Sequence, residues 1–267
     1  MDIFGFIGTG NMGGALARAC AQAIFNENLL LSDSYAPVAE KLAEELGCKA
    51  IAVNEVAEKA NFLFLGVKPQ VMAQMLSGIA PILKKRKEGF VLVSMAAGLS
   101  IENIRKMAGG NYPVIRIMPN IPVKVGSGVV LYDATENVTE TALNAFRSAM
   151  AGAGLLDQLP EKLIDAGSAV SGCGPAFVAL FAEALADGAV ECGLPRDKAL
   201  TYALQTIAGT AEFLLETGTH PAVLKDAVCS PGGTTIAGVH AMELGGFRGT
   251  ASEAVLSAYQ KTLELGK

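Results

Sequence analysis

The residues best suited to chemistry lie near the start of the chain, in the segment Gly8-Thr9-Gly10-Asn11-Met12-Gly13, directly behind an apolar run at residues 3–7. The first glycine of this spacing permits a tight turn, the second lets the backbone approach a pyrophosphate, and the third lets the following helix pack on the strand. The N-terminus of that helix then attracts the anion. A glycine-rich turn without a ligand is the alternative, but the strand, turn and helix context favours a nicotinamide-dinucleotide site and hydride chemistry.

The preference for NADH or NADPH depends on the end of the second predicted strand. Asp33 lies there, twenty positions after Gly13. A carboxylate accepts hydrogen bonds from the ribose hydroxyls and repels a 2′-phosphate, which favours NADH. Ser32 and Ser34 could instead donate to that phosphate, although no arginine, its usual partner, occurs between residues 29 and 40. Asp33 could equally be a turn residue or a helix N-cap, so the choice of cofactor stays open.

Further segments of glycine, proline and polar residues fall where predicted strands end or helices begin. Ligands of open α/β sheets sit at the carboxyl ends of the strands, and glycines with hydroxyl groups before a helix form anion sockets. These segments are therefore candidate ligand contacts. Those after strands are Gly66-Val67-Lys68-Pro69, Met95-Ala96-Ala97-Gly98 and Met118-Pro119-Asn120. Those before later helices are Ser171-Gly172-Cys173-Gly174-Pro175 and Ser230-Pro231-Gly232-Gly233-Thr234-Thr235.

The elements that must hold these segments change character along the chain. In the first part, helical patterns alternate with short apolar runs at residues 3–7, 29–31, 62–67, 90–95, 114–118 and 129–132. This alternation predicts an α/β fold, with a Rossmann-type doubly wound, mostly parallel sheet in a dinucleotide-binding domain at residues 1–159. The strand signals then stop, which predicts an all-helical C-terminal domain at residues 160–267.

The helix expected to begin near Gly174 is apolar on every side. Phe177, Leu180 and Phe181 follow one stripe, and Val178 lies on the opposite face. Such a helix must be buried all round, and a helical domain of this size has little interior for it unless a second copy of the chain covers it. Hydrophobic residues make up 51% of the chain and charged residues only 18%, which also favours a homo-oligomer.

Composition argues against several other classes. The net charge of −5, without a basic run, makes nucleic acid an unexpected partner. The five cysteines are scattered and never form Cys-x-x-Cys, which indicates reduced thiols in the cytoplasm. No signal or transit peptide is indicated, and the apolar stretch at residues 176–186 is too short and interrupted for a membrane span. His220 and His240 have no partner at metal-ligand spacing, so no metal site is expected.

Along the whole chain, the order and spacing of these segments resemble pyrroline-5-carboxylate reductase. The segment at residues 230–235, followed by a helix and Gly245-Gly246-Phe247-Arg248, is the most specific part. The resemblance implies reduction of 1-pyrroline-5-carboxylate to L-proline, the last step of proline biosynthesis, by hydride transfer from NADPH or NADH. It also implies that the helical domain binds substrate and forms an interlocked homodimer, and larger rings of dimers occur in the family.

The resemblance gives the last socket a role at the substrate. Backbone amides of Gly232, Gly233 and Thr234 would hold the substrate carboxylate, because such donors and the helix dipole favour an anion without arginine. The hydroxyl of Thr235 would be the catalytic group that orients or relays a proton to the ring nitrogen. Thr234 and Thr235 could instead cap the helix expected at residues 236–244, and Ser171 could likewise be a cap.

The resemblance also extends the cofactor site. Lys68 would lie beside the cofactor, Asn54 would meet its adenosine half and Asn120 would lie near the nicotinamide, although a strand-end lysine, a helix cap and a loop spacer explain them equally. The expected cofactor-binding residues are Ile7, Gly8, Thr9, Gly10, Asn11, Met12, Gly13, Ser32, Asp33, Ser34, Asn54, Gly66, Val67, Lys68, Pro69, Met95, Ala96, Ala97, Gly98 and Asn120. The expected substrate-binding residues are Met118, Pro119, Ser171, Ser230, Gly232, Gly233, Thr234 and Thr235.

One position departs from the family pattern. Some members carry a glutamate near Gly218 that is associated with the proline site, so here either Glu216 substitutes or backbone contacts suffice. A β-hydroxyacid dehydrogenase is the alternative enzyme, but that class needs a catalytic lysine on the first long helix of its second domain, and residues 163–195 contain none. A non-catalytic NAD(P) sensor is a further alternative, against which the socket at residues 230–235 argues.

Overall fold

The computed structural model describes residues 1–87 and 89–265 and divides the chain into two compact units. Unit 1 comprises Met1–Cys173 with the residues from Ala258 onward, and unit 2 comprises Gly174–Ser257. The division therefore follows residue 173, later than the predicted boundary at residue 159. The reason is that helix α7 (Glu161–Ser171) packs on the sheet of unit 1, where its fully buried Ile164 joins Met118 and Leu131.

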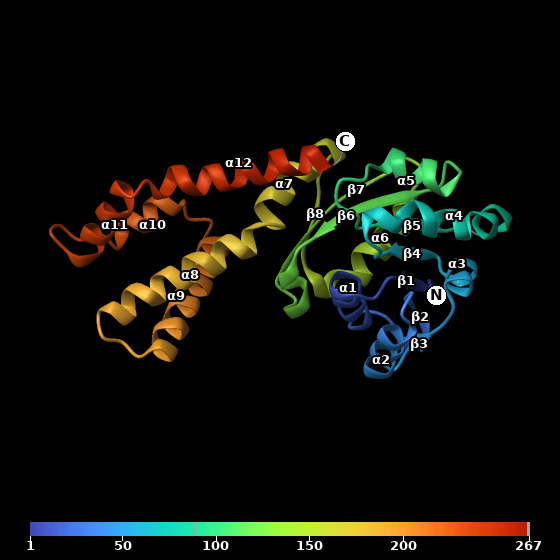
Figure 1. Cartoon of the computed structure of the whole chain (residues 1–267), viewed down its shortest axis with the longest axis horizontal. Coiled ribbons are helices and arrows are strands. Elements are labelled where there is room, and N and C mark those ends of the chain that lie inside the picture. The colour runs from blue at the N-terminus through green and yellow to red at the C-terminus, as the bar shows by residue number, and fades with distance from the viewer. Residues whose placement is uncertain (88, 266–267) are drawn as a thin grey trace. The chain divides into compact units, whose positions relative to one another are not determined.

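Unit 1 is built on an eight-stranded sheet in the order β3-β2-β1-β4-β5-β6-β7-β8, which Figure 1 shows with helices around it. Every neighbouring pair is parallel except β6 with β7, so the prediction of a doubly wound, mostly parallel sheet is confirmed. Two strands escaped prediction, because β3 has only two residues and β8 exposes much of its length. The strands are β1 (Phe4–Ile7), β2 (Leu29–Ser32), β3 (Lys49–Ala50), β4 (Phe62–Leu65), β5 (Val91–Ser94), β6 (Val114–Pro119), β7 (Gly128–Ala134) and β8 (Gly154–Gln158).

Helices cover both faces of this sheet, which explains why its central strands are apolar at successive positions. Phe4 and Phe6 of β1 pack into one core with α1, α2 and α6, whereas Ile7 belongs to a second core with α3, α4 and α5. The helices of unit 1, besides α7, are α1 (Asn11–Ala21), α2 (Ala36–Leu46), α3 (Val53–Lys59), α4 (Pro69–Lys85), α5 (Ile101–Ala108) and α6 (Glu140–Ala149). Short 3₁₀ turns lie at η1 (Asn26–Asn28), η2 (Ile121–Val125) and η3 (Ala151–Ala153).

The strand register aligns the ends of the three central strands. Ile7 of β1 pairs with Leu65 of β4, and Leu65 in turn pairs with Ser94 of β5. The next residues, Gly8, Gly66 and Met95, therefore leave the sheet at the same carboxyl edge. This edge is where ligands of doubly wound sheets bind.

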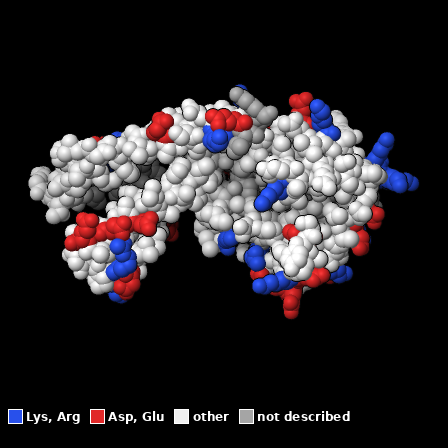
Figure 2. Space-filling model, in the orientation of Figure 1, with Lys and Arg blue, Asp and Glu red and all other residues white. Residues whose placement is uncertain are grey.

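Unit 2 is helical, as predicted. The long helix α8 exposes most of its apolar side chains within the chain: only Ala182 and Ala186 are buried, whereas Leu180 is 67% exposed and Val178 47%. In Figure 2 few charged side chains lie over the region of α11, and Glu243 is the only Lys, Arg, Asp or Glu within this helix. The apolar character read from the sequence is thus present, but this chain alone does not bury it. The helices beyond α7 are α8 (Gly174–Glu191), α9 (Arg196–Thr217), α10 (Pro221–Ala227), α11 (Thr234–Leu244) and α12 (Phe247–Leu265).

One helical stretch among the described residues, Glu161–Glu191, is long and apolar enough to cross a membrane by length and composition. It is longer than the apolar run at residues 176–186 considered in the sequence, because α7 and α8 follow each other almost without interruption. Only 17% of its most apolar window is buried within the chain. Length and composition alone are weak evidence for a membrane, since helices that pack against other helices pass the same test.

Candidate dinucleotide and substrate sites

The glycine-rich loop between β1 and α1 is shaped by backbone contacts that allow no side chain. Gly8 has a φ of +95°, and a Cβ added to it would lie 2.7 Å from the carbonyl oxygen of Gly66. A Cβ on Gly13 would lie 2.0 Å from the carbonyl oxygen of Gly8. Around Gly10, by contrast, no atom lies within 4 Å of the corresponding Cβ position. The loop is therefore closely packed except at Gly10, where its surface is open.

Gly10 is the N-cap of α1, so this open surface lies at the start of the helix. The first amides of an α-helix lack intrahelical acceptors, and the helix dipole adds partial positive charge there. A group with negatively charged oxygens that approaches Gly10 thus meets free donors and no side chain. These features fit the pyrophosphate of a dinucleotide.

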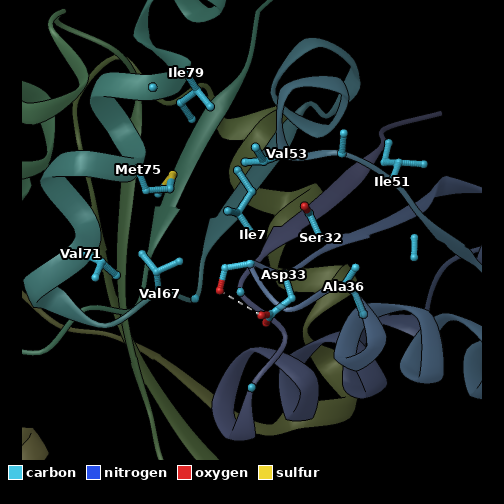
Figure 3. A pocket seen from close by; sticks show the side chains of 18 of the residues that line it. Ile7, Ser32, Asp33, Ala36, Ile51, Val53, Val67, Val71, Met75 and Ile79 are labelled. Atoms are coloured by element: carbon cyan, nitrogen blue, oxygen red, sulfur yellow. Dashed lines mark hydrogen bonds between the residues drawn. The ribbon is translucent and has the colours of Figure 1, made fainter.

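A cavity of about 1170 Å³ extends from this loop along the carboxyl edge of the sheet. It has room for a ligand of dinucleotide size. In Figure 3, Ser32, Asp33 and Ala36 line one side of the cavity, and Val67, Val71 and Met75 line the other. The predicted cofactor residues that line it are Ile7, Gly8, Gly10, Asn11, Met12, Ser32, Asp33, Ser34, Asn54, Gly66, Val67 and Lys68.

The carboxylate of Asp33 is bound to the glycine-rich loop. The amide of Thr9 donates to Asp33 Oδ2 at 2.8 Å, and the Thr9 hydroxyl donates to the same oxygen at 3.3 Å. The amide of Tyr35 donates to Oδ1 at 3.0 Å. Asp33 does not cap α2, whose N-cap is Tyr35. Among the alternatives left open by the sequence, the geometry therefore gives Asp33 a turn role and adds one that was not foreseen, the attachment of the loop to the end of β2.

The other predicted cofactor residues lie outside the cavity. Thr9 and Gly13, which belong to the glycine-rich segment, are buried, and Pro69 is the first residue of α4. In the segment after β5, Ala96 is buried, Ala97 is exposed and Gly98 has a φ of +74°, a conformation that favours glycine. This segment leaves the same edge of the sheet as the glycine-rich loop, at the strand next to β4.

An apolar wall of the cavity was not predicted. Val71, Met75 and Ile79 of α4 lie at intervals of four residues and line the cavity, as Figure 3 shows. This spacing places them on one face of the helix. The sequence contained the signal, but an apolar stripe on a crossover helix is more commonly part of the core, and Ile79 is indeed buried.

Lys68 and Asn54 border the cavity with exposed side chains. Lys68 is the N-cap of α4 and makes no side-chain cap hydrogen bond. Asn54 is the second residue of α3, whose N-cap is Ala52, so the alternative that Asn54 caps this helix is wrong. Both side chains are therefore placed to reach a ligand in the cavity.

Asn120 is occupied by contacts within unit 1. Its Oδ1 accepts from the amide of Val129 at 2.8 Å, and its Nδ2 donates to the carbonyl oxygen of Ser171 at 2.9 Å. The side chain is 7% exposed and ties the end of β6 to the end of α7. Ser171 is the last residue of α7, and its hydroxyl donates to the carbonyl oxygen of Gly167 at 3.1 Å. Ser171 therefore does not cap the next helix, which was the alternative left open by the sequence.

The substrate socket predicted in unit 2 is the start of α11. Gly233 is its N-cap, and Thr234 and Thr235 are its first two residues, so neither threonine is the N-cap proposed as the alternative. Gly232 has a φ of +67°, and the amide of Gly233 donates to the carbonyl oxygen of Ser230 at 3.0 Å. The backbone thus turns tightly into a helix start at which Gly232, Thr234 and Thr235 are exposed. The first amides of a helix have no acceptor within the helix.

Gly218 has a structural reason to be glycine. It is the C-cap of α9 with a φ of +64°, where any other residue is strained. A glutamate at this position would therefore disturb the end of the helix. Glu216 lies in the last turn of α9 and is exposed.

Neither histidine lies in a metal-binding group. His220 accepts from the amide of Ala222 through Nδ1 and caps α10, whereas His240 lies within α11. Over residues 1–87 and 89–265, no three His, Cys, Asp or Glu side chains are placed to hold a metal ion. The cysteines of these residues are free, and burial raises the pKa of the Cys20 and Cys48 thiols.

Two family models match different parts of the chain. Residues 161–265 match the family model described as pyrroline-5-carboxylate reductase dimerisation. Residues 3–98 match a model described as NADP oxidoreductase, coenzyme F420-dependent. The two models therefore cover the helices that follow the sheet and the glycine-rich loop with its cavity, respectively.

Relatives cover the whole length of the chain. A pyrroline-5-carboxylate reductase of a Synechocystis species is 41% identical over 98% of both chains, and that of Glycine max is 39% identical over 98% of this chain and 95% of its own. The crystal structure of Plasmodium falciparum pyrroline carboxylate reductase with NADP bound superimposes with a TM-score of 0.88, at 32% identity, and covers 100% of this chain and 98% of that one. The chain belongs to the pyrroline-5-carboxylate reductase family.

Proposed function

We propose that this chain reduces 1-pyrroline-5-carboxylate to L-proline with NADPH or NADH, as the last step of proline biosynthesis. The observation that carries the proposal is the glycine cradle at the start of α1, open at Gly10 above a large cavity, in a chain with full-length similarity to named reductases. The helix start at α11 supplies the second anion socket that a carboxylate substrate needs.

In this proposal the chain's own residues bind and orient. When bound, the reduced nicotinamide supplies the hydride that the imine carbon takes up. The free amides at the start of α1 hold the pyrophosphate, and Lys68 adds positive charge at the edge of the cavity. Val71 and Met75 give the cavity an apolar wall suited to a flat ring.

At the substrate, the start of α11 performs two tasks. The amides of Gly232 and Thr234 hold the carboxylate, because helix-start donors favour an anion. The amide of Gly233, also expected to take part, instead donates to the carbonyl oxygen of Ser230. The hydroxyl of Thr235 orients the proton that the ring nitrogen bears when the imine carbon takes up hydride. Thr235 does not cap α11, so its side chain is not committed to the N-terminus of the helix.

We also propose that the chain accepts both dinucleotides. The bonds from Thr9 and Tyr35 turn the carboxylate of Asp33 toward the loop, which weakens its role as a reader of the ribose hydroxyls. Ser32 and Ser34, which flank Asp33 in the chain, line the cavity, and their hydroxyls can donate to a 2′-phosphate. Rates with NADPH and NADH at equal concentrations, measured with the same substrate, test this proposal.

A second copy of this chain is the proposed partner, and the cytoplasm is the proposed location. Leu180 and Val178 of α8 are exposed in the single chain, and the region containing α8 matches a dimerisation model. A homodimer would cover this surface, and rings of dimers would extend it. The molar mass in solution, measured by light scattering, gives the number of copies.

The test of the function is the oxidation of NADPH and NADH in the presence of 1-pyrroline-5-carboxylate, compared with oxidation of 3-hydroxy acids in the reverse direction. Turnover with the imine and none with the hydroxy acids is expected. The absence of turnover with the imine would refute the function.

The role of Thr235 has its own test. Thr235→Ala should lower kcat by about 10²-fold, the lower end of what a positioned proton-transfer group contributes, and leave dinucleotide affinity unchanged. Thr235→Ser keeps the hydroxyl and serves as the matched control, which should retain most of the turnover. Equal turnover of the alanine and serine variants would show that another group handles the proton.

A further inference from the structure

The arginine on β6 is buried in a place where the proposed reaction gives it no role. Arg116 is 3% exposed. Its Nη2 contacts Asp165 Oδ1 at 2.5 Å, and its Nη1 contacts Glu161 Oε1 at 3.3 Å. Its Nε is also buried and makes no hydrogen bond with the described residues. Its two partners are 30% and 25% exposed. A buried guanidinium paired in this way gives little net stability compared with an apolar side chain of the same volume, so stability alone does not explain the arginine.

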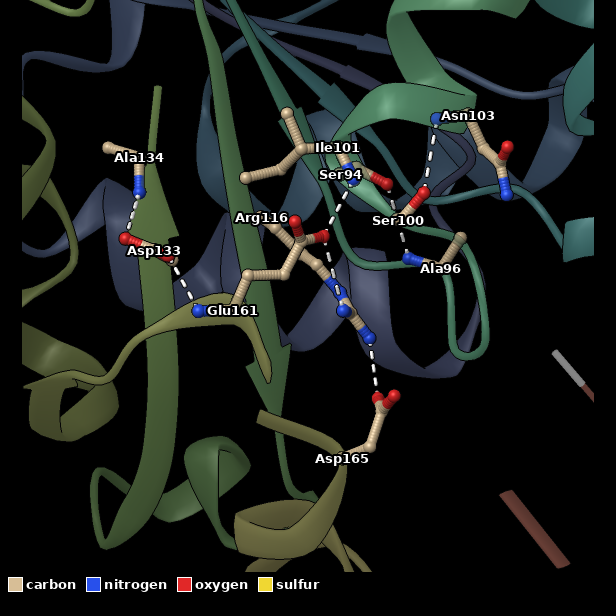
Figure 4. A network of polar contacts seen from close by, with 10 residues as sticks. All are labelled: Ser94, Ala96, Ser100, Ile101, Asn103, Arg116, Asp133, Ala134, Glu161 and Asp165. Atoms are coloured by element: carbon tan, nitrogen blue, oxygen red, sulfur yellow. Dashed lines mark hydrogen bonds and ion pairs between the residues drawn. The ribbon is translucent and has the colours of Figure 1, made fainter. Parts of the chain in front are cut away.

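The contacts of this network join four elements of unit 1, namely β6, α7, α5 and β7, as Figure 4 shows. Glu161 and Asp165 belong to the first turns of α7. Glu161 Oε1 also accepts from the amide of Ile101 at 2.7 Å, and Ile101 begins α5 directly after the segment that follows β5. Asp133 of β7 accepts from the amide of Glu161 at 2.6 Å. The guanidinium on β6 therefore fixes the start of α7, and through Glu161 it also fixes the start of α5.

The strand register places this network beside the carboxyl edge of the sheet. Arg116 pairs with Ser94, the last residue of β5, and Ser94 is level with Leu65 of β4. The segment from Met95 to Ser100 lies between Ser94 and Ile101, so both of its ends are held next to the network. The other end of α7 carries Ser171, which Asn120 holds from the end of β6.

We propose that Arg116 is a positioning residue of the reduction. It touches neither ligand, but it holds the segment at residues 95–100 and helix α7 in the geometry that the nicotinamide half of the cofactor needs. This inference rests on the proposed function. It differs from a general structural role because it concerns one half of the dinucleotide. The residues expected to meet the adenosine ribose, Ser32 and Asp33, lie at the end of β2, which β1, β4 and β5 separate from β6, and no residue of the network lines the cavity.

The experiment compares two ligands of the same protein. Arg116→Met removes the charge and the two-armed contact, whereas Arg116→Lys keeps a charge that cannot bridge both carboxylates in the same way. Arg116→Met should bind 2′-phospho-ADP-ribose, which lacks nicotinamide, as tightly as the original protein. It should bind NADPH more weakly and lose about 10²-fold in kcat, because small displacements of a reacting group are costly. The NADPH affinity and the kcat of Arg116→Lys should lie between those of Arg116→Met and those of the original protein.

A second variant separates positioning from folding. Removing Arg116 alone leaves the carboxylates of Glu161 and Asp165, which are only 30% and 25% exposed, without their partner, and this can destabilise the protein. The triple variant Arg116→Met, Glu161→Gln, Asp165→Leu removes these charges as well, so its melting temperature should recover. Its kcat should stay low, because α7 and the segment after β5 are no longer fixed by the guanidinium. Arg147→Met, which removes an arginine bonded to Tyr132 and Glu140 outside this network, is the matched control and should keep its kcat.

Two results would overturn the proposal. One is the recovery of kcat together with the melting temperature in the triple variant, which would mean that Arg116 acts only through stability. The other is an equal loss of affinity for 2′-phospho-ADP-ribose and NADPH in Arg116→Met. If the original protein itself showed no turnover with 1-pyrroline-5-carboxylate, the proposed function would fail, whereas the comparison of the two ligands would still test the position of the segment after β5.

Discussion

Replacement of Asp33 distinguishes a carboxylate that reads the ribose from one that holds the glycine-rich loop. In the structure, Asp33 Oδ2 accepts from the amide and the hydroxyl of Thr9, and Oδ1 accepts from the amide of Tyr35. Thr9 is only 4% exposed, so water cannot readily replace the acceptor that its amide would lose. Asp33→Ala therefore leaves a buried donor without a partner beside the pyrophosphate cradle.

The size of the effect follows from these bonds. A hydrogen bond to a charged group contributes about 1.5–3 kcal/mol, and a buried donor left without a partner costs about 1–3 kcal/mol. The two values are estimates for the loss of the same hydrogen bond and are not added. The closed conformation of the loop should therefore be destabilised by about 2 kcal/mol. Affinity falls by the fraction of molecules whose loop is no longer formed. The dissociation constants of NADPH and NADH should both rise, by up to roughly 30-fold.

The assay is the titration of each dinucleotide by calorimetry or by quenching of protein fluorescence. Asp33→Asn keeps one acceptor oxygen for Thr9 but presents an amide group to Tyr35. Its loss of dinucleotide affinity should therefore be smaller than that of Asp33→Ala. Arg147→Met is the control, because Arg147 bonds to Tyr132 and Glu140 and does not line the cavity. Tighter binding of NADPH together with weaker binding of NADH in Asp33→Ala would refute the reasoning, since that pattern belongs to a carboxylate facing the ribose.

Two further predictions follow from the loop and from α8. Gly10→Ala should keep the melting temperature, because no atom lies within 4 Å of its Cβ position. It should weaken dinucleotide binding roughly 10-fold or more, because the added methyl group fills the space that the pyrophosphate needs. Unchanged affinity would place the ligand elsewhere. Gly13→Ala should lower both melting temperature and affinity, because its Cβ would lie 2.0 Å from the carbonyl oxygen of Gly8. Leu180 is 67% exposed in the single chain, and Leu180→Glu places a charge at this position. If a second copy covers Leu180, burial of the charge is costly and light scattering should detect smaller assemblies. An unchanged molar mass would show that this surface is not part of the interface.

The sequence was sufficient for the elements whose pattern is set by burial. Apolar runs such as that at Phe62–Leu65 are buried on both sides, which produces the continuous pattern of a parallel strand. Strand β8 was not predicted because it lies at the edge of the sheet, where a strand can expose polar residues such as Asp157. The packing of α7 is a related case: its helical pattern shows that it is a helix, but not which sheet or helix its Ile164 packs against.

Side-chain partners were harder to predict than segments, because a partner depends on which distant segments meet. Asp33 had the right position for a ribose contact, but the sequence does not show that the amide of Thr9 comes within 2.8 Å of its carboxylate. Asn120 was predicted near the nicotinamide, whereas both ends of its amide are held by Val129 and Ser171. In both cases the structure gives the residue a supporting contact that its position in the motif does not reveal.

The glycines of the cradle show how one motif contains two different requirements. Gly8 and Gly13 are required by the protein itself, because side chains there would collide with backbone atoms of Gly66 and Gly8. Gly10 meets no such obstacle, so packing within the chain does not require a glycine there. A glycine at this point is explained only by a ligand that comes close to the backbone. The open position, more than the closely packed ones, is therefore the part of the motif that indicates function.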